Sequence, residues 1–193
     1  MSAIAQFQPF ISVEEYLEGE RVSEIRHEYV DGQVYAMAGA SADHNRIVTN
    51  VCGELRERLR GKRCEPFMAD MKLKLPASNV FYYPDALVAC DPSDNAPYFR
   101  ERPTVVFEVL SPETERTDER EKRLAYATIP SLKVYVIIAQ HERRLTVLRR
   151  GRTEPWKPEV VEGRNAVLKL PEIRVEIPLA RIYERTQAGR RGA

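Results

Sequence analysis

The stretches Tyr82-Tyr83-Pro84-Asp85 and Thr104-Val105-Val106-Phe107-Glu108-Val109-Leu110 decide the fold of this chain. Each is typical of a short apolar strand with one carboxylate among residues that would otherwise fill a core. An ionised carboxylate is costly in such a place, and two of them on neighbouring strands repel each other. Because a divalent cation relieves both problems, Asp85 and Glu108 together predict a metal site.

The alternation of side chains along the two strands supports this pairing. Successive side chains of a strand point to opposite faces of the sheet, so Asp85 shares a face with Leu87 and Glu108 shares one with Val106 and Leu110. If the strands are neighbours in suitable register, both carboxylates face the same side. The alternative is that either acid lies exposed at a strand end or is paired with an arginine.

A lysine on the following helix is a third candidate site residue. We expect a helix that is capped by Thr117 or Asp118 and ends before Pro130. Lys122 lies on its apolar face, where its stem can cover the sheet and its ammonium can reach the carboxylates. The other residues of that face are Ala125, Tyr126 and Ile129. The alternative is an ordinary ion pair between Lys122 and Asp118, four residues apart.

These motifs resemble the PD-(D/E)XK nuclease superfamily, and more narrowly a branch of restriction endonucleases that is abundant in cyanobacteria. Pro84-Asp85 corresponds to the "PD" and Glu108 to the second acid, but Leu110 stands where the superfamily has its lysine. In the narrower branch the following helix supplies that lysine. The matching segments lie within residues 10 to 150 and comprise Glu28-Tyr29-Val30-Asp31-Gly32, Val34 to Gly39, His44-Asn45-Arg46-Ile47, Glu108 to Thr114, Asp118 to Lys122, and Tyr126.

The resemblance implies a mixed α/β (α+β) fold with a restriction-endonuclease-like core, in which helices flank a central mixed sheet and a helix and hairpin come first. It also implies a metal-dependent endonuclease that hydrolyses phosphodiester bonds of DNA. In that role Asp85 and Glu108 bind Mg²⁺, for which Mn²⁺ can substitute, with a backbone carbonyl near Val109 as a further ligand. Lys122 is the catalytic lysine, and Glu28 is an additional acid close to the site.

Two other functions are compatible with the same residues. A nuclease-fold module without turnover could bind nucleic acid or a protein partner, because a fold supports a site more firmly than an activity. Paired carboxylates also serve glycosidases. However, the chain has a single tryptophan, Trp156, which lies outside the proposed site, and sugar-binding sites commonly need aromatic faces.

Length and charge set weaker limits. The 193 residues suffice for one domain with a substantial core, and we expect this domain to span residues 1–186. The basic, glycine-containing end, residues 187–193, is predicted to be disordered. With 30 basic and 29 acidic residues, the overall charge does not identify a nucleic-acid-binding protein. A nuclease needs only a local positive surface.

Cysteine content and hydropathy indicate a cytoplasmic protein. Cys52, Cys64 and Cys90 are odd in number and lack metal-ligand spacing, so Cys52 and Cys90 are expected to be small core residues. No segment reaches membrane-spanning length. Because nucleases that cut both strands often act as symmetric pairs, a homodimer is expected.

The remaining elements follow from capping, turn and periodicity signals. Asp31-Gly32 predicts a tight hairpin turn, and Ser12 opens a capping box. Helices are expected from Ser12 to about Leu17, from Asp43 to Leu59 and from Pro178 to about Glu184. Strands are expected at 29–30, 34–37, 66–75, 80–90, 104–110, 133–138, 144–148, 159–162 and 173–177.

Several other polar residues have two interpretations each. His44 lies in the first turn of the long helix, where a structural role is the simpler interpretation and a site role the alternative. Asp70, Lys72 and Lys74 share one strand face, which is either the solvated side of a sheet or a guide for phosphate. The arginines near the last hairpin could contact a phosphate backbone without reading sequence. They are Arg143, Arg144, Arg149, Arg150 and Arg152.

Overall fold

The core of the protein is a six-stranded mixed sheet, in the order β11-β10-β9-β8-β6-β3. The computed structural model describes residues 10–37, 39–76, 78–110, 118–151 and 156–190. All strand pairs of this sheet are antiparallel except β8 and β9, which run parallel because helix α3 connects them. Its strands are β3 (Glu65–Met68), β6 (Ala86–Ala89), β8 (Pro103–Leu110), β9 (Val134–Ala139), β10 (Arg144–Arg149) and β11 (Lys157–Glu162). The predicted mixed sheet is confirmed.

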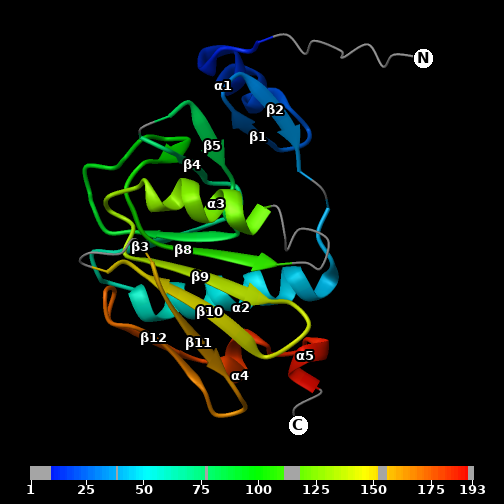
Figure 1. The fold of residues 1–193 in the computed structure, drawn as a ribbon, viewed down its shortest axis with the longest axis vertical. Coiled ribbons are helices and arrows are strands. Elements are labelled where there is room, and N and C mark those ends of the chain that lie inside the picture. Colours follow the sequence, from blue (N-terminus) through cyan, green and yellow to red (C-terminus); the bar gives the residue numbers. More distant parts are fainter. Residues whose placement is uncertain (1–9, 38, 77, 111–117, 152–155, 191–193) are drawn as a thin grey trace.

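A second, five-stranded sheet has the order β2-β1-β5-β4-β7 and lies at the N-terminal end of the molecule (Figure 1). Its hairpin turns at Asp31-Gly32, where both residues have positive φ (46° and 88°), as the sequence predicted. Its strands are β1 (His27–Val30), β2 (Gln33–Ala36), β4 (Lys72–Lys74), β5 (Val80–Tyr82) and β7 (Phe99–Arg100).

Two expected long strands are each divided between the two sheets. Residues 66–75 form β3 and β4, and residues 80–90 form β5 and β6, so the chain passes from one sheet to the other within each of these two segments. The second passage is Tyr83-Pro84-Asp85, where proline removes a backbone donor and interrupts the ladder. The change of sheet therefore places Asp85 at the start of β6, where the two sheets meet.

Helix α2 (Ala42–Leu59) covers one face of the six-stranded sheet, as Figure 1 shows. Ser41 caps it, and the predicted stripe of Ile47, Val48, Val51, Leu55 and Leu59 is buried in the first core cluster. The small sheet of β12 (Val167–Leu170) and β13 (Val175–Pro178), with α4 (Leu179–Ile182), completes this layer. β12 was not anticipated, whereas β13 matches the strand expected at 173–177.

Helix α3 (Asp118–Ala127) lies on the opposite face of the six-stranded sheet (Figure 1). Tyr126 and Ile129 are fully buried there, in a second core cluster that joins both sheets. Leu87 and Val106 belong to this cluster, so the predicted alternation along β6 and β8 is confirmed. At the other end of the molecule, α1 (Val13–Val22) begins with the expected capping box, in which Ser12 and Glu15 exchange hydrogen bonds.

The C-terminal residues differ from the expectation of a disordered tail. Gln187–Arg190 form a short helix, α5, which buries Ala188. The backbone N–H of Gln187 donates to Asp43 at 2.9 Å, so a contact with α2 holds the segment. Local composition carries no sign of such a long-range contact, and residues 191–193 lie outside the described residues.

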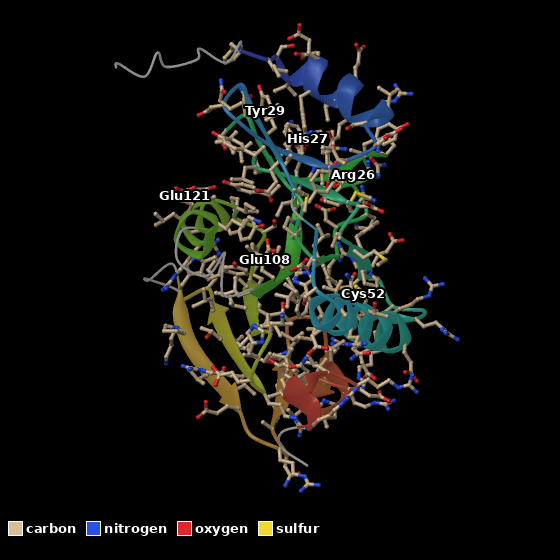
Figure 2. The ribbon with its side chains drawn as sticks, turned by 90° about the vertical axis from the view of Figure 1, so that its right-hand side faces the viewer. Arg26, His27, Tyr29, Cys52, Glu108 and Glu121 are labelled. Carbon is tan, nitrogen blue, oxygen red and sulfur yellow. A yellow bond between two sulfur atoms is a disulfide. The ribbon has the colours of Figure 1, made fainter. Side chains whose placement is uncertain are left out.

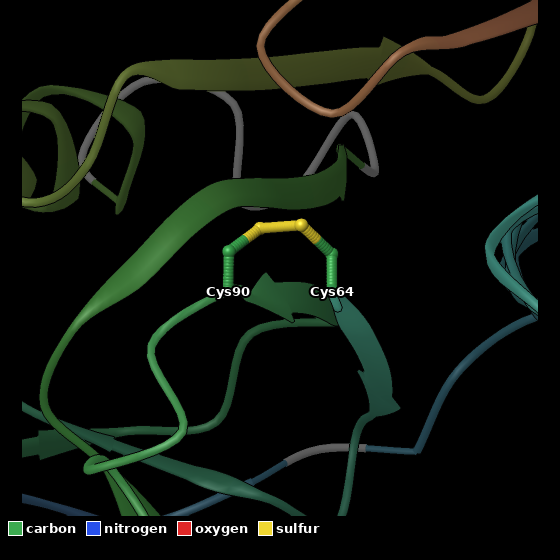
Figure 3. Close-up of a disulfide and its surroundings, with 2 residues drawn as sticks. All are labelled: Cys64 and Cys90. Atoms are coloured by element: carbon green, nitrogen blue, oxygen red, sulfur yellow. A yellow bond between two sulfur atoms is a disulfide. The ribbon is translucent and has the colours of Figure 1, made fainter. Parts of the chain in front are cut away.

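Cys64 and Cys90 form a disulfide, shown in Figure 3, whereas the sequence suggested that Cys90 is an unpaired core residue. Glu65 and Ala89 are partners in the antiparallel β3–β6 ladder. Cys64 precedes Glu65 and Cys90 follows Ala89, so the same register places the two cysteines opposite each other. The two cysteines are 26 residues apart, and only strand pairing brings them together. Cys52 carries a free thiol whose pKa burial raises to about 11.

None of the helices in the described parts of the chain has the length and apolar character needed to cross a membrane.

Candidate active site

Asp85 lies at the point where β6 begins, directly beside β8. Ala86 pairs with Phe107, and the same register continued by one residue sets Asp85 opposite Glu108. Oδ2 of Asp85 accepts a hydrogen bond from the backbone N–H of Val109 at 2.7 Å. The β6–β8 ladder ends at Ala86, so the carboxylate provides an acceptor for a backbone N–H of β8 that β6 itself does not bond. Side chains directly opposite each other share a face, so Asp85 and Glu108 are neighbours.

Glu108 is an acid buried in the core, with only 7% of its surface exposed. The hydroxyl of Tyr126 donates to its Oε1 at 2.7 Å. Burial raises the pKa of Glu108 to about 7, and the charges of Asp85 and Glu28 act in the same direction. Lys122 and the Tyr126 hydroxyl lower that pKa but do not compensate. The site is therefore a place where added positive charge is favourable.

Lys122 reaches this acid from α3. Its ammonium lies 2.9 Å from Oε1 of Glu28 and 3.5 Å from Oε1 of Glu108. The residue is 8% exposed, and the ammonium lies 5.5 Å from the centre of the Tyr82 ring. It is thus directed into the protein, as expected for the apolar face of α3. The side chain of Asp118, the alternative partner, lies outside the described residues.

Glu28 comes from the hairpin strand β1, in the other sheet. Its Oε1 forms an ion pair with the ammonium of Lys122 and lies 3.5 Å from the backbone nitrogen of Tyr83. Tyr83 directly precedes Pro84-Asp85, so Glu28 is tied to the segment that carries the first acid. Residues from β1, β8 and α3 therefore meet at one place, and sequence alone did not predict the contact between Glu28 and Lys122.

His44 joins the site from α2. Its Nε2 lies 2.9 Å from Oδ1 of Asp85, and both side chains are largely buried. Burial lowers the pKa of His44, but the hydrogen bond and charge of Asp85 and the charge of Glu108 outweigh it, so the pKa is raised overall. Figure 2 shows Glu108 between the helix that carries Glu121, α3, and the helix that carries Cys52, α2.

Two further contacts in this site were missed by sequence reasoning. Tyr126 was placed on the apolar face of α3 but not assigned to Glu108, and His44 was left between a structural and a site role. The available signal was position, since His44 comes three residues before the buried Ile47 and Tyr126 three residues before the buried Ile129. Their partners lie 18 and 41 residues away, so only the packed layers bring them together.

The donor set agrees with a hard divalent cation that keeps much of its own water. Within the described residues, no group of three or more His, Cys, Asp or Glu side chains is arranged to hold a metal. Mg²⁺ commonly binds proteins through one or two carboxylates and retains several waters. Asp85 and Glu108 can supply these two carboxylates. Burial raises the pKa of Glu108, so a bound cation would favour its charged form.

Several arginines of the last hairpin are engaged in structural contacts. Arg150 donates to the carbonyls of Ala127, Ile129 and Leu132 and lies over the ring of Trp156. This tryptophan is buried, which removes it as an exposed sugar-binding face. Arg149 pairs with Glu159 and Glu172, and Arg144 with Glu142 and Glu162. The guanidinium of Arg143 donates to the carbonyl of Gly189, and Arg152 lies outside the described residues.

The residues Asp70, Lys72 and Lys74 also have partners within the protein, but only the two lysines share a strand, because Asp70 lies in the turn before β4. Asp70 pairs with Arg26, and Lys74 pairs with Glu101 at 2.8 Å. Lys72 is buried, with its ammonium 5.3 Å from the centre of the Tyr83 ring, and burial lowers its pKa. These contacts favour a structural role for the three residues.

Replacing Tyr126 by phenylalanine is expected to destabilise the protein at pH 8 by about 1.5–3 kcal/mol, because the buried Glu108 carboxylate loses a hydrogen bond. Urea unfolding of the metal-free protein measures this change. Tyr35→Phe is the matched control, because Tyr35 is 55% exposed and should tolerate the loss of its hydroxyl. Equal stability of the two variants would show that the Tyr126 hydroxyl contributes nothing to holding Glu108.

The layered sheet, with two acids at its centre and a lysine from the following helix, defines the class as a restriction-endonuclease-like fold of the PD-(D/E)XK type. A crystal structure titled as a "putative nuclease belonging to DUF820" from Anabaena variabilis superposes with a TM-score of 0.71 and 16% identity. The match covers 90% of this chain and 97% of that one. At this identity it establishes the fold.

The chain belongs to the Uma2 family, described as "Putative restriction endonuclease", which matches residues 13–180. Two proteins of Synechocystis sp. are similar over most of their length. The protein slr1290 is 34% identical over 77% of this chain and 78% of its own length. The protein sll1609 is 29% identical over 86% of this chain and 95% of its own length.

Proposed function

We propose that this protein is a metal-dependent endonuclease that hydrolyses phosphodiester bonds of DNA. The observation that carries the proposal is the convergence of Lys122 on Glu28 and Glu108, at 2.9 and 3.5 Å, beside Asp85. These side chains come from separate elements of two sheets and a helix, and ion pairs so deeply buried are rarely the most stable filling of a core. Membership in the Uma2 family supports the same class of activity.

In this proposal Asp85 and Glu108 hold Mg²⁺, with a backbone carbonyl near Val109 as a further ligand, and Mn²⁺ can substitute. Bound there, the cation would polarise the scissile phosphate and lower the pKa of a coordinated water. Asp85 is held by Val109 and His44, and Glu108 by Tyr126. Both carboxylates are thus oriented before any ligand arrives, which lowers the cost of binding.

Lys122 would orient the attacking water, help to remove its proton and offset the charge that builds on the phosphorane. Glu28 is the partner that keeps the ammonium in place, since its oxygen is nearer to Nζ than that of Glu108. The buried, largely apolar surroundings strengthen these electrostatic contacts relative to water. Glu28 therefore acts in the site through Lys122.

Cleavage of plasmid and short duplex DNA in the presence of Mg²⁺ or Mn²⁺ tests the function. Lys122→Ala is expected to lower the rate about 100-fold, the lower end of what a positioned proton-transfer group contributes. Lys133→Ala is the matched control, because Lys133 is exposed on the segment that follows α3. Unchanged cleavage by the Lys122 variant would remove the lysine from the reaction.

A nuclease-fold module that binds without cutting is the second candidate. It is favoured by the lack of a third acidic or imidazole ligand among the described residues, and by Leu110 at the usual position of the lysine. Calorimetric titration with Mg²⁺ or Mn²⁺, followed by incubation with single- and double-stranded DNA, separates the candidates. Metal binding without any cleavage product would favour the module.

Cutting both strands of a duplex would be served by two copies of the site related by a two-fold axis. We therefore propose a homodimer as the active form. Light scattering coupled to size-exclusion chromatography, with and without duplex DNA, measures the mass in solution. A single-chain mass at concentrations where cleavage is complete would contradict the proposal.

A further inference from the structure

We propose that His44 is a positioning residue for Asp85, through which α2 sets the orientation of a metal-binding carboxylate from the opposite face of the sheet. The inference rests on the proposed function, because it concerns the affinity of the same site for a divalent cation. It assigns a role to a side chain for which a structural role was the simpler interpretation of the sequence.

Both oxygens of Asp85 are engaged, and by different elements. Oδ2 accepts from the backbone N–H of Val109 at 2.7 Å, and Oδ1 lies 2.9 Å from Nε2 of His44. A single donor leaves a carboxylate free to turn about its Cβ–Cγ bond, whereas two donors on opposite oxygens fix its plane. Because an ionised carboxylate only accepts, Nε2 of His44 must carry the proton in this contact.

The position of His44 is set by the rigid part of α2. Ser41 caps the helix, and its hydroxyl accepts the backbone N–H of His44 at 3.1 Å. One turn later, Ile47 is fully buried against the six-stranded sheet. The imidazole therefore projects from a helix end that is fixed both by its cap and by its packing. In the contact, the His44 side chain is 17% exposed and that of Asp85 is 16% exposed.

Nε2 of His44, which donates its proton to Asp85, has no lone pair for a metal, and in this proposal His44 acts on the cation through the carboxylate. Histidine and carboxylate pairs of this kind orient the group that binds the metal, and their loss typically costs about 10–100-fold in metal affinity. We expect a loss of this size for His44→Ala, together with a protein that remains folded because the apolar stripe of α2 is unchanged.

Calorimetric titration of the protein with Mn²⁺ alone tests the inference. The wild type is compared with three variants, His44→Gln, His44→Asn and His44→Ala. In His44→Gln, the amide Nε2 stands the same number of bonds from Cα as the imidazole Nε2 and can donate to Oδ1. In His44→Asn, the amide is one bond shorter and cannot reach Oδ1 without movement of α2. We expect His44→Gln to bind Mn²⁺ with nearly the affinity of the wild type. The affinity of His44→Asn and of His44→Ala should be about 10–100-fold weaker.

Comparing His44→Gln with His44→Asn isolates the effect of the hydrogen-bond donor to Oδ1 of Asp85, because both variants are polar and both should keep the helix. Equal affinity of wild type and His44→Ala would overturn the inference while leaving metal binding, and with it the proposed function, intact. Equal weakening of all three variants would also overturn it, since a donor at the right reach would then be of no help. Absence of Mn²⁺ binding in the wild type would overturn both proposals together.

Electron spin echo spectroscopy of the Mn²⁺-loaded wild type supplies a second readout that does not depend on activity. A positioning role predicts no strong coupling from a directly bound imidazole nitrogen. A coupling that is present in the wild type and lost in His44→Gln would make His44 a ligand and refute the positioning role.

Discussion

Asp85→Asn is expected to abolish metal-dependent cleavage, with a loss of at least about 1000-fold, while the protein stays folded. Loss of a bound cation removes several kcal/mol of charge stabilisation in the transition state, and about 4 kcal/mol corresponds to this factor. The fold should persist because the amide can serve both neighbours of Asp85. Its oxygen can accept from Val109, and its NH₂ can donate to a His44 tautomer with a lone pair on Nε2.

The matched control is Asp91→Asn, a change of the same chemistry at the opposite end of β6. Asp91 is partly exposed and bonds to Ser93 and Arg102, away from the proposed site. Initial rates on plasmid DNA over a range of Mg²⁺ concentrations, with circular dichroism of each variant, measure the effect. If Asp85→Asn cuts DNA at a wild-type rate, Asp85 holds no catalytic metal.

Glu108→Gln is expected to have two opposite effects. Cleavage should fall at least about 1000-fold, because the second carboxylate ligand is lost. The metal-free protein, in contrast, should become more stable at pH 8, by roughly 1–3 kcal/mol, since a buried charge with a raised pKa is replaced by a neutral group. The glutamine oxygen can still accept from Tyr126, so no buried hydroxyl loses its acceptor.

The pH dependence of this stability difference follows from the direction of the pKa shift. The pKa of Glu108 is raised from an ordinary 4.5 to about 7 in the folded protein, because burial disfavours the charged form. Its stabilising contribution is therefore complete below pH 4.5 and is lost as the pH rises through 7. The advantage of Glu108→Gln over the wild type should be small near pH 4.5 and largest above pH 7.

Thermal or urea unfolding at several pH values, in the presence of a chelator, measures the difference. Added Mg²⁺ should stabilise the wild type and leave Glu108→Gln unchanged, because binding to the native state adds to its stability. A glutamine variant that is less stable than the wild type at pH 8 would mean that Glu108 contributes to folding as a charged group. In that case burial would not disfavour the charged form of Glu108.

The acids of the candidate site could be found from sequence because each interrupts a local pattern. Asp85 and Glu108 stand out in apolar strands, and Lys122 stands out on the apolar face of a helix. Strand alternation and helix periodicity depend only on near neighbours in the chain, so they also predicted the buried stripe of α2 and the faces of β6 and β8. The roles of these residues in metal binding and cleavage stay predictions until the variants are measured.

The partners of these residues could not be found in the same way. Glu28 meets Lys122, His44 meets Asp85 and Tyr126 meets Glu108, and the members of each pair come from different elements. Nothing in a strand or helix pattern records which other element packs against it. The arginine residues of the last hairpin illustrate the same limit. Their positive charge suggested contacts with phosphate, but in the structure they bind backbone carbonyls and acidic side chains.

By itself, the sequence determined the mixed α/β class, the hairpin at Asp31-Gly32, the capping box of the first helix and the two acids that belong to one sheet face. These features depend on steric and hydrophobic preferences that act over a few residues. Only the tertiary structure decided that the chain changes sheets at Pro84, that Cys64 meets Cys90, and that Gln187–Arg190 form a packed helix. Such contacts join residues far apart in the chain, and they form only when separate layers pack together.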